Sequence, residues 1–137
     1  MYISVAQIIL PNKPLTNVEL NKAAQELKIP NFRGVFLRDT LPMKPRRKEC
    51  GIFNLDSSSG DGTHWVAWYK NGDVAFYFDS YGIQPPLELT KYVDTPLFYN
   101  TLQVQPAGEV FCGHLCLYIL KEMSKGKDMQ TVLNTLY

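Results

Sequence analysis

The chain contains 137 residues, about the size of one domain, and residues 1–137 are expected to fold as a single domain. Hydrophobic residues make up 45% and charged residues 20%, a composition that excludes intrinsic disorder, collagen and coiled coils. The formal net charge of +1 gives no general indication of a nucleic-acid or membrane partner.

The N-terminal segment and the cysteines indicate the compartment. Residues 1–11 lack the basic region and the cleavage site of a signal peptide, so secretion is not expected. No apolar run is long enough to span a membrane. Three cysteines are too few for a disulfide scaffold, so we expect free thiols and an intracellular location.

The first predicted element is a helix over residues 17–28. Thr16 can act as the N-cap, and Glu19 then occupies the position that completes a capping box. Its apolar residues recur at helical spacing: Leu20, Ala23, Ala24 and Leu27. Ile29-Pro30 is expected to end the helix, because the residue before a proline avoids helical geometry.

Residues 32–55 predict two extended segments separated by a basic run. Residues 32–37 are expected to be extended or irregular, and residues 50–55 to form a buried strand. The basic run is expected to be a solvated loop broken by proline. The alternative is a local anionic contact, such as weak nucleic-acid binding. Its cations are Lys44, Arg46, Arg47 and Lys48.

A β-hairpin is the strongest local prediction. Two strand-like segments, residues 64–69 and 74–78, flank Asn71-Gly72, which is typical of a type I′ turn. The resulting register places His64 directly opposite Asp79, and opposed Cβ atoms lie about 4.5–5.5 Å apart. An imidazole and a carboxylate are therefore expected within hydrogen-bonding reach. The other face of the hairpin should pack on the core: Trp65, Ala67, Tyr69, Val74, Phe76 and Phe78.

The last third of the chain predicts mainly helices. Residues 86–93 favour a short helix, 101–105 a strand and 106–108 a turn. From Cys112 the apolar period becomes helical, and Gly126 is a fitting stop. A final short helix is expected over Met129, Val132, Leu133 and Leu136. The order of elements predicts an α+β fold with a mainly antiparallel sheet and packed helices.

Cys112, at the start of the predicted C-terminal helix, has two interpretations. Free cysteine is most often a small buried hydrophobe. Alternatively it is a nucleophile, because the oriented amides of a helix N-terminus and a nearby imidazolium both lower the pKa of a thiol. His64 with its carboxylate partner Asp79 fits a general base, and the amide of Gln105 could donate to an oxyanion.

The triplet Cys112-x-His114-x-Cys116 offers a competing metal interpretation. On a helix the two cysteines share a face, whereas His114 points away from them. Zinc sites also favour a distant second pair of ligands. We therefore expect no metal site, and His114 is expected on the exposed side of the helix.

The four roles occur in a specific order, His64-Trp65, Asp79, Gln105 and Cys112-Gly113. This order resembles the adenain family, the adenovirus-type cysteine endopeptidases, which share a clan with the ubiquitin-like-protein proteases. The seven-residue spacing from glutamine to cysteine is also similar. Weaker similarities occur in three further segments, Phe32–Phe36, Cys50–Asn54 and Phe78–Gly82.

The resemblance implies an adenain-like cysteine protease fold. It implies that Cys112 is the nucleophile, His64 the base, Asp79 the orienting carboxylate and Gln105 an oxyanion donor. Trp65 and Gly113 would contact substrate. Cleavage through a thioester is implied after small residues, glycine above all, in the capsid or core precursors of a virus or virus-like element.

The family also implies context and alternatives. An activating peptide or DNA is the only additional factor that it suggests, and a monomer in the nucleus, cytoplasm or virion is expected. The family carries glutamate where this chain has Asp79, whereas ubiquitin-like-protein proteases carry aspartate. Deconjugation of ubiquitin-like modifiers is therefore an alternative, although known domains of that type are longer. The other alternative is a non-catalytic binding module.

Overall fold

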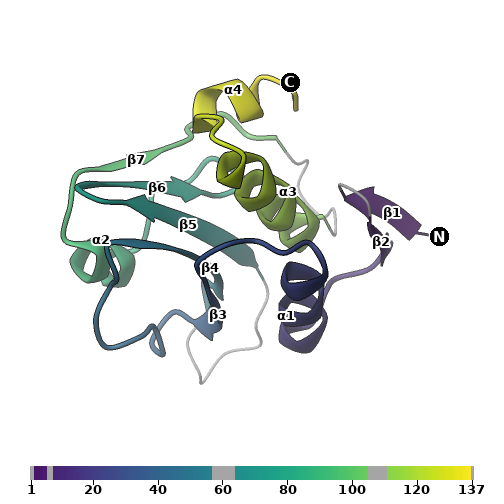
Figure 1. The fold of residues 1–137 in the computed structure, drawn as a ribbon, viewed down its shortest axis with the longest axis horizontal. Coiled ribbons are helices and arrows are strands. Elements are labelled where there is room, and N and C mark those ends of the chain that lie inside the picture. The colour runs from purple at the N-terminus through teal and green to yellow at the C-terminus, as the bar shows by residue number, and fades with distance from the viewer. Residues whose placement is uncertain (1, 6–7, 57–63, 105–110, 137) are drawn as a thin grey trace.

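A five-stranded sheet forms the centre of the fold, with strand order β3-β4-β5-β6-β7 (Figure 1). This computed structural model describes residues 2–5, 8–56, 64–104 and 111–136. The strands are β1 (Tyr2–Val5), β2 (Ile8–Pro11), β3 (Phe32–Leu37), β4 (Lys48–Asn54), β5 (Trp65–Asn71), β6 (Val74–Phe78) and β7 (Leu97–Tyr99). The helices are α1 (Asn17–Glu26), α2 (Leu87–Val93), α3 (Cys112–Ser124) and α4 (Met129–Leu133).

The sheet is antiparallel in its middle and parallel at its edges. Strand β5 runs antiparallel to both β4 and β6, whereas β3 pairs with β4 and β7 pairs with β6 in parallel. Strands β1 and β2 form a separate antiparallel pair. The predicted α+β class with a mainly antiparallel sheet and packed helices is therefore confirmed.

Helices cover both faces of this sheet. Figure 1 shows α3 lying across β5, with α1 and α4 beside it. This face carries the predicted core residues Trp65, Ala67 and Phe78. The opposite face is buried as well, because α2 packs Leu89 and Val93 against it. No helix in the described part of the chain is long and apolar enough to cross a membrane.

The hairpin forms, but its predicted register is wrong. Asn71 pairs with Val74, so the two turn residues are Gly72 and Asp73. Gly72 has a φ of +66°, whereas the φ of Asp73 is not positive. This is the pattern of a type II′ rather than a type I′ turn. The pairing shifts by two residues. Because side chains alternate with a period of two, every residue keeps its predicted face.

The helices largely follow the prediction. Thr16 and Glu19 form the predicted capping box, with N–H···O distances of 3.1 and 3.0 Å. Helix α1 ends earlier than expected, since Lys28 adopts a left-handed φ of 55°. Helices α2, α3 and α4 begin within one residue of the predicted positions.

The strand expected at residues 101–105 is wrong for the part that is described. The strand lies earlier, at β7, because Leu97–Tyr99 pair in parallel with β6. Beyond β7, the N–H of Val104 donates to the carbonyl of Ser80, which follows β6, at 2.8 Å. Residues 105–110, including the expected turn at 106–108, lie outside the described residues.

Candidate active site

Three side chains from three elements meet where β5 begins and β6 ends. His64 directly precedes β5, Asp79 directly follows β6, and Cys112 is the first residue of α3. The His64 Nε2 lies 2.7 Å from the Asp79 Oδ1, and the same ring is hydrogen-bonded to the thiol of Cys112. The carbonyl of His64 accepts a 2.9 Å hydrogen bond from the N–H of Leu55, so the end of β4 holds its backbone.

The contact between His64 and Asp79 forms despite the different register. The observed pairing places neither residue within the β5–β6 ladder, and the two side chains meet diagonally beyond it. Diagonal neighbours on one face remain within reach of long side chains. The predicted contact is therefore present, for a different geometric reason.

Asn100 holds the backbone of Asp79 from both sides. Its Oδ1 accepts from the N–H of Asp79 at 3.1 Å, and its Nδ2 donates to the carbonyl of Asp79 at 2.7 Å. Both residues are buried. The chain can turn tightly after Asp79 because Gly82 has a φ of +72°, and a Cβ there would lie 2.7 Å from the carbonyl oxygen of Thr101. The carboxylate is thus fixed by neighbours that sequence reasoning did not identify.

Tyr81 positions the imidazole ring. Its ring stacks on that of His64, with centroids 4.4 Å apart and planes inclined by 11°. Its backbone N–H also donates to the Asp79 Oδ1 at 2.9 Å. One residue therefore restrains both members of the pair. In the sequence, Tyr81 could have been found as the aromatic residue of the segment Phe78–Gly82, which is similar to the protease family.

The pKa values of the imidazole and the thiol move in opposite directions. Burial of His64 disfavours its charged form, but hydrogen bonds to Asp79 and Cys112 outweigh burial and raise its pKa to about 9. Burial of Cys112 opposes the thiolate, but contacts with His64 and with the backbone of Trp65 and Gly113 lower its pKa. These directions favour a thiolate–imidazolium pair at neutral pH.

Trp65 and Gly113 pack closely beside Cys112. The indole of Trp65 is 8% exposed, and its Nε1 donates to the carbonyl of Leu15 at 2.8 Å. A Cβ on Gly113 would lie 3.2 Å from Leu20 and 3.4 Å from Trp65. Glycine here lets the start of α3 approach α1 and the sheet. Both residues therefore border the thiol and also fix the position of the helix that carries it.

Two further expectations have different outcomes. Gln105, the proposed oxyanion donor, lies outside the described residues. The prediction of an exposed His114 is wrong, because its side chain is buried and its Nε2 lies 2.8 Å from the carbonyl oxygen of Pro11 in β2. No group of three or more His, Cys, Asp or Glu side chains that could hold a metal occurs among the described residues.

The fold is similar to that of known proteases. No family model matches the chain, and no curated protein matches it. The ASFV pS273R protease is 18% identical with a TM-score of 0.65, covering 93% of this chain and 63% of that chain. The SUMO protease Ulp1, with its catalytic cysteine oxidised to a sulfinic acid, is 15% identical with a TM-score of 0.57, covering 91% and 74%. The chain has the Ulp1-like cysteine protease fold.

This likeness confirms, at the level of the fold, the predicted resemblance to the proteases of this clan. The chain spans less than two thirds of the length of the ASFV protease. At 15% and 18% sequence identity, the similarity shows that the fold is shared. The contact of His64 with Asp79 and Cys112 is an observation on this chain itself.

Proposed function

We propose that this protein is a cysteine endopeptidase. The observation that carries the proposal is the contact of a buried His64–Asp79 pair, 2.7 Å apart, with the thiol of Cys112 at a helix N-terminus. The pKa of Cys112 is lowered while that of His64 is raised. This combination supplies a nucleophile and an acid at the same pH, as acyl transfer requires.

In the first proposed step, the Cys112 thiolate attacks the carbonyl carbon of the scissile peptide bond. A tetrahedral intermediate forms, and its oxyanion is stabilised by N–H groups in the first turn of α3 and by the amide of Gln105. The C–N bond then breaks. The His64 imidazolium gives its proton to the leaving amine, and a thioester on Cys112 remains.

In the second proposed step, water hydrolyses the thioester. His64, now neutral, takes a proton from the water as the oxygen attacks the thioester carbon. The carbon–sulfur bond breaks, the carboxylic acid product leaves, and the thiolate–imidazolium pair is restored. Asp79 keeps the ring oriented and stabilises its charge throughout. This sequence uses side chains and water alone.

The proposed substrates are capsid or core precursor proteins of a virus or virus-like element, cut after small residues and above all glycine. The similarity to a protease of ASFV supports a viral setting. The packing of Trp65 against the start of α3 supports a narrow approach to Cys112. Trp65 and Gly113 are the proposed substrate contacts.

Cleavage of a peptide library tests this function. Peptides with Gly-x-Gly and Gly-Gly sites are incubated in reducing buffer with the wild type, Cys112→Ala and Cys116→Ala. Cleavage after glycine that is lost only in Cys112→Ala supports the proposal. Equal cleavage by the wild type and Cys112→Ala contradicts it, because the nucleophile would then lie elsewhere.

The similarity to the SUMO protease Ulp1 favours a second candidate, the removal of ubiquitin-like modifiers. Reporters that carry a modifier joined through its C-terminal Gly-Gly distinguish the two functions. Turnover of the reporters without turnover of the peptides supports deconjugation. If neither is cleaved and Cys112 resists iodoacetamide, a non-catalytic binding role replaces both.

A further inference from the structure

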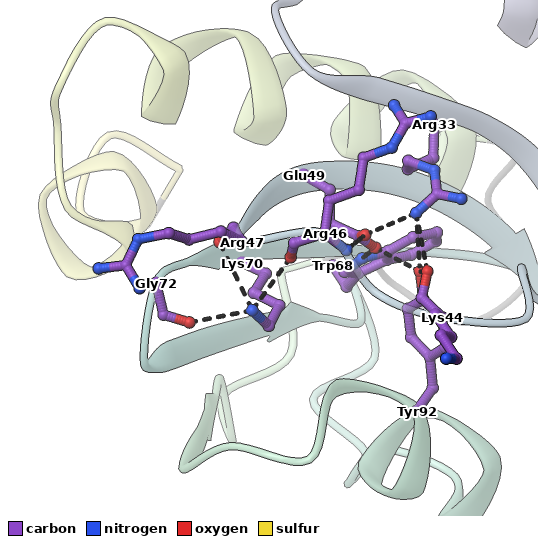
Figure 2. Close-up of polar contacts among 9 residues, drawn as sticks. All are labelled: Arg33, Lys44, Arg46, Arg47, Glu49, Trp68, Lys70, Gly72 and Tyr92. Carbon is purple, nitrogen blue, oxygen red and sulfur yellow. Dashed lines mark hydrogen bonds and ion pairs between the residues drawn. The ribbon is translucent and has the colours of Figure 1, made fainter.

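A buried carboxylate lies at the end of β4 that is remote from the candidate active site. The side chain of Glu49 has no exposed surface. It accepts hydrogen bonds from Arg33 Nη1 at 2.9 Å, Trp68 Nε1 at 2.8 Å, Tyr92 Oη at 2.6 Å and the backbone N–H of Arg46 at 2.5 Å (Figure 2). A buried charge is tolerated when it is fully hydrogen-bonded. Glu49 thereby fixes the chain at Arg46.

Lys70 fixes the same chain segment from the neighbouring strand. Its ammonium group donates to the carbonyl oxygens of Arg46 and Gly72 at 3.0 Å, and to that of Arg47 at 3.5 Å (Figure 2). Lys70 is 8% exposed, and its backbone lies opposite that of Glu49 in the register of β4 and β5. The side chains of Glu49 and Lys70 therefore both form hydrogen bonds with the backbone of one loop.

Residues 44–48, the loop before β4 together with its first residue Lys48, are here called the basic loop. Arg33 binds its first carbonyl, that of Lys44, at 3.0 Å. Its four charged side chains are exposed, namely Lys44, Arg46, Arg47 and Lys48. Among the described residues, none of the ion pairs includes any of these four, whereas Lys13 and Arg38 are each paired with a glutamate. Buried groups thus hold four unpaired cations on one fixed backbone.

The basic loop and the candidate active site lie at opposite ends of β5. Lys48 pairs with Asn71 at one end of this strand, and Trp65, next to His64, begins the other end. Seven residues of strand span about 20 Å. An extended peptide advances at most about 3.3–3.6 Å per residue. A polypeptide reaching from Cys112 to the loop therefore needs about six residues or more.

We propose that the basic loop binds an acidic segment of the protein substrate, about six or more residues from the scissile bond. The proposal rests on the proposed protease function. Arginine pairs with carboxylates through two parallel hydrogen bonds, and a pre-ordered loop loses little entropy on binding. Four cations within five residues, in a chain of net charge +1, fit a short acidic peptide. Nucleic-acid sites instead spread basic residues over a whole face.

Two matched peptide substrates test the proposal. They share one glycine cleavage site. Eight residues away on each side of this site, one peptide carries four glutamates and the other carries four glutamines. They are cleaved by the wild type, by Arg46→Gln/Arg47→Gln and by a control with the same change in charge, Lys22→Gln/Lys28→Gln. The wild type and the control should prefer the glutamate peptide about tenfold in kcat/KM, through KM. The arginine variant should lose this preference while cleaving the glutamine peptide normally. An unchanged preference in the arginine variant, or none in the wild type, overturns the proposal.

Binding measurements separate failure of this proposal from failure of the protease function. Fluorescence anisotropy of labelled peptides is recorded with Cys112→Ala as the common background, so that the peptides stay intact. If no peptide is cleaved by the wild type but the arginine changes weaken binding of the glutamate peptide tenfold, the loop still binds acidic peptide and only the protease function fails. Equal binding of the glutamate peptide by Cys112→Ala with and without the two arginine changes overturns the loop proposal. Tighter, arginine-dependent binding of a single-stranded oligonucleotide also overturns it, in favour of nucleic acid.

Discussion

The two ends of β5 each bury charged side chains, but they satisfy them differently. At the end that carries the basic loop, the Glu49 carboxylate accepts from four donors and Lys70 donates to three carbonyls. At the other end, the Asp79 Oδ1 accepts from Tyr81 and binds His64, whereas its Oδ2 has no hydrogen-bond partner among the described residues. One carboxylate is saturated and the other is not.

This difference separates a structural network from one that suits the proposed chemistry. Around Glu49 the donors are the backbone N–H of Arg46, the buried indole of Trp68 and the half-buried side chains of Arg33 and Tyr92, so the network holds a loop in place. Around Asp79 the principal side-chain partner is His64, which can gain or lose a proton, and His64 in turn contacts a thiol with a lowered pKa. The proposed reactivity therefore lies at the end where the buried carboxylate contacts a side chain that can gain or lose a proton.

Replacing the nucleophile should have the largest effect. Cys112→Ala is expected to lower kcat/KM by at least about 10⁴-fold, because the attacking atom is lost. Cys116→Ala, one turn along the same helix, is the matched control. Cys116 is fully buried, and burial raises its pKa. Iodoacetamide near pH 7 should therefore alkylate Cys112 much faster than Cys116, as peptide mass mapping would show. Equal rates would contradict the activated thiol.

Removing the charge of Asp79 should have the next largest effect. Asp79→Asn is expected to lower kcat/KM by about 10³-fold, since the imidazolium loses its stabilising partner. The wild-type profile should be bell-shaped, with an alkaline limb near the His64 pKa of about 9. In Asp79→Asn this limb should move to lower pH. An unchanged alkaline limb would show that another group sets it.

The same shift predicts how stability depends on pH. The pKa of His64 is raised from its ordinary 6.5 to about 9, so the folded state holds the proton more tightly than the unfolded state. The resulting stabilisation is fully present below about pH 6.5 and is lost as the pH rises through about 9. Urea unfolding at pH 6, 7.5 and 9.5 should show this decline, and Asp79→Asn should show less of it.

Breaking the saturated network should lower stability rather than change the chemistry. Glu49→Ala leaves the buried indole N–H of Trp68 without an acceptor and removes the carboxylate from Arg33 and Tyr92, so it should cost about 3–5 kcal/mol in the free energy of unfolding. Glu88→Ala, which removes an exposed partner of Arg38, should cost at most about 1 kcal/mol. Chemical denaturation measures both. A changed pH–rate profile in Glu49→Ala would show that the two ends are not separate.

The stacked tyrosine should give the smallest effect. Tyr81→Leu removes the ring that lies 4.4 Å from the imidazole of His64, whereas Tyr81→Phe retains it. A stacked pair contributes about 0.5–1.5 kcal/mol, so the leucine variant should lose about two- to tenfold in kcat. The phenylalanine variant should stay close to wild type. Similar losses in both variants would assign the effect to the hydroxyl group instead.

Local patterns predicted the elements that depend on neighbouring residues. The capping box at Thr16 and Glu19 and the start of α3 at Cys112 follow from short-range spacing, and the structure contains both. The hairpin was predicted, but its register was not. An Asn-Gly pair favours one turn, whereas Lys70 and the backbone of Arg47 hold Gly72 in another.

Features that depend on distant residues were missed. Strand β7 exists because it pairs in parallel with β6, a partner that its own three residues do not reveal. His114 is buried because β2 covers that side of α3. Asn100 gave no local signal, although its amide holds Asp79 on both sides.

The order of residue types along the chain by itself determined the α+β class, the face of each hairpin residue and the three side chains placed together at the candidate active site. Periodicity and turn signals act over a few residues, and a shift of two along a strand leaves the faces unchanged. Only the tertiary structure decided the hairpin register, the two hydrogen bonds between Asn100 and the backbone of Asp79 and the fixed position of the basic loop. These depend on hydrogen bonds between residues far apart in sequence, which form only once the sheet has assembled around its buried charges.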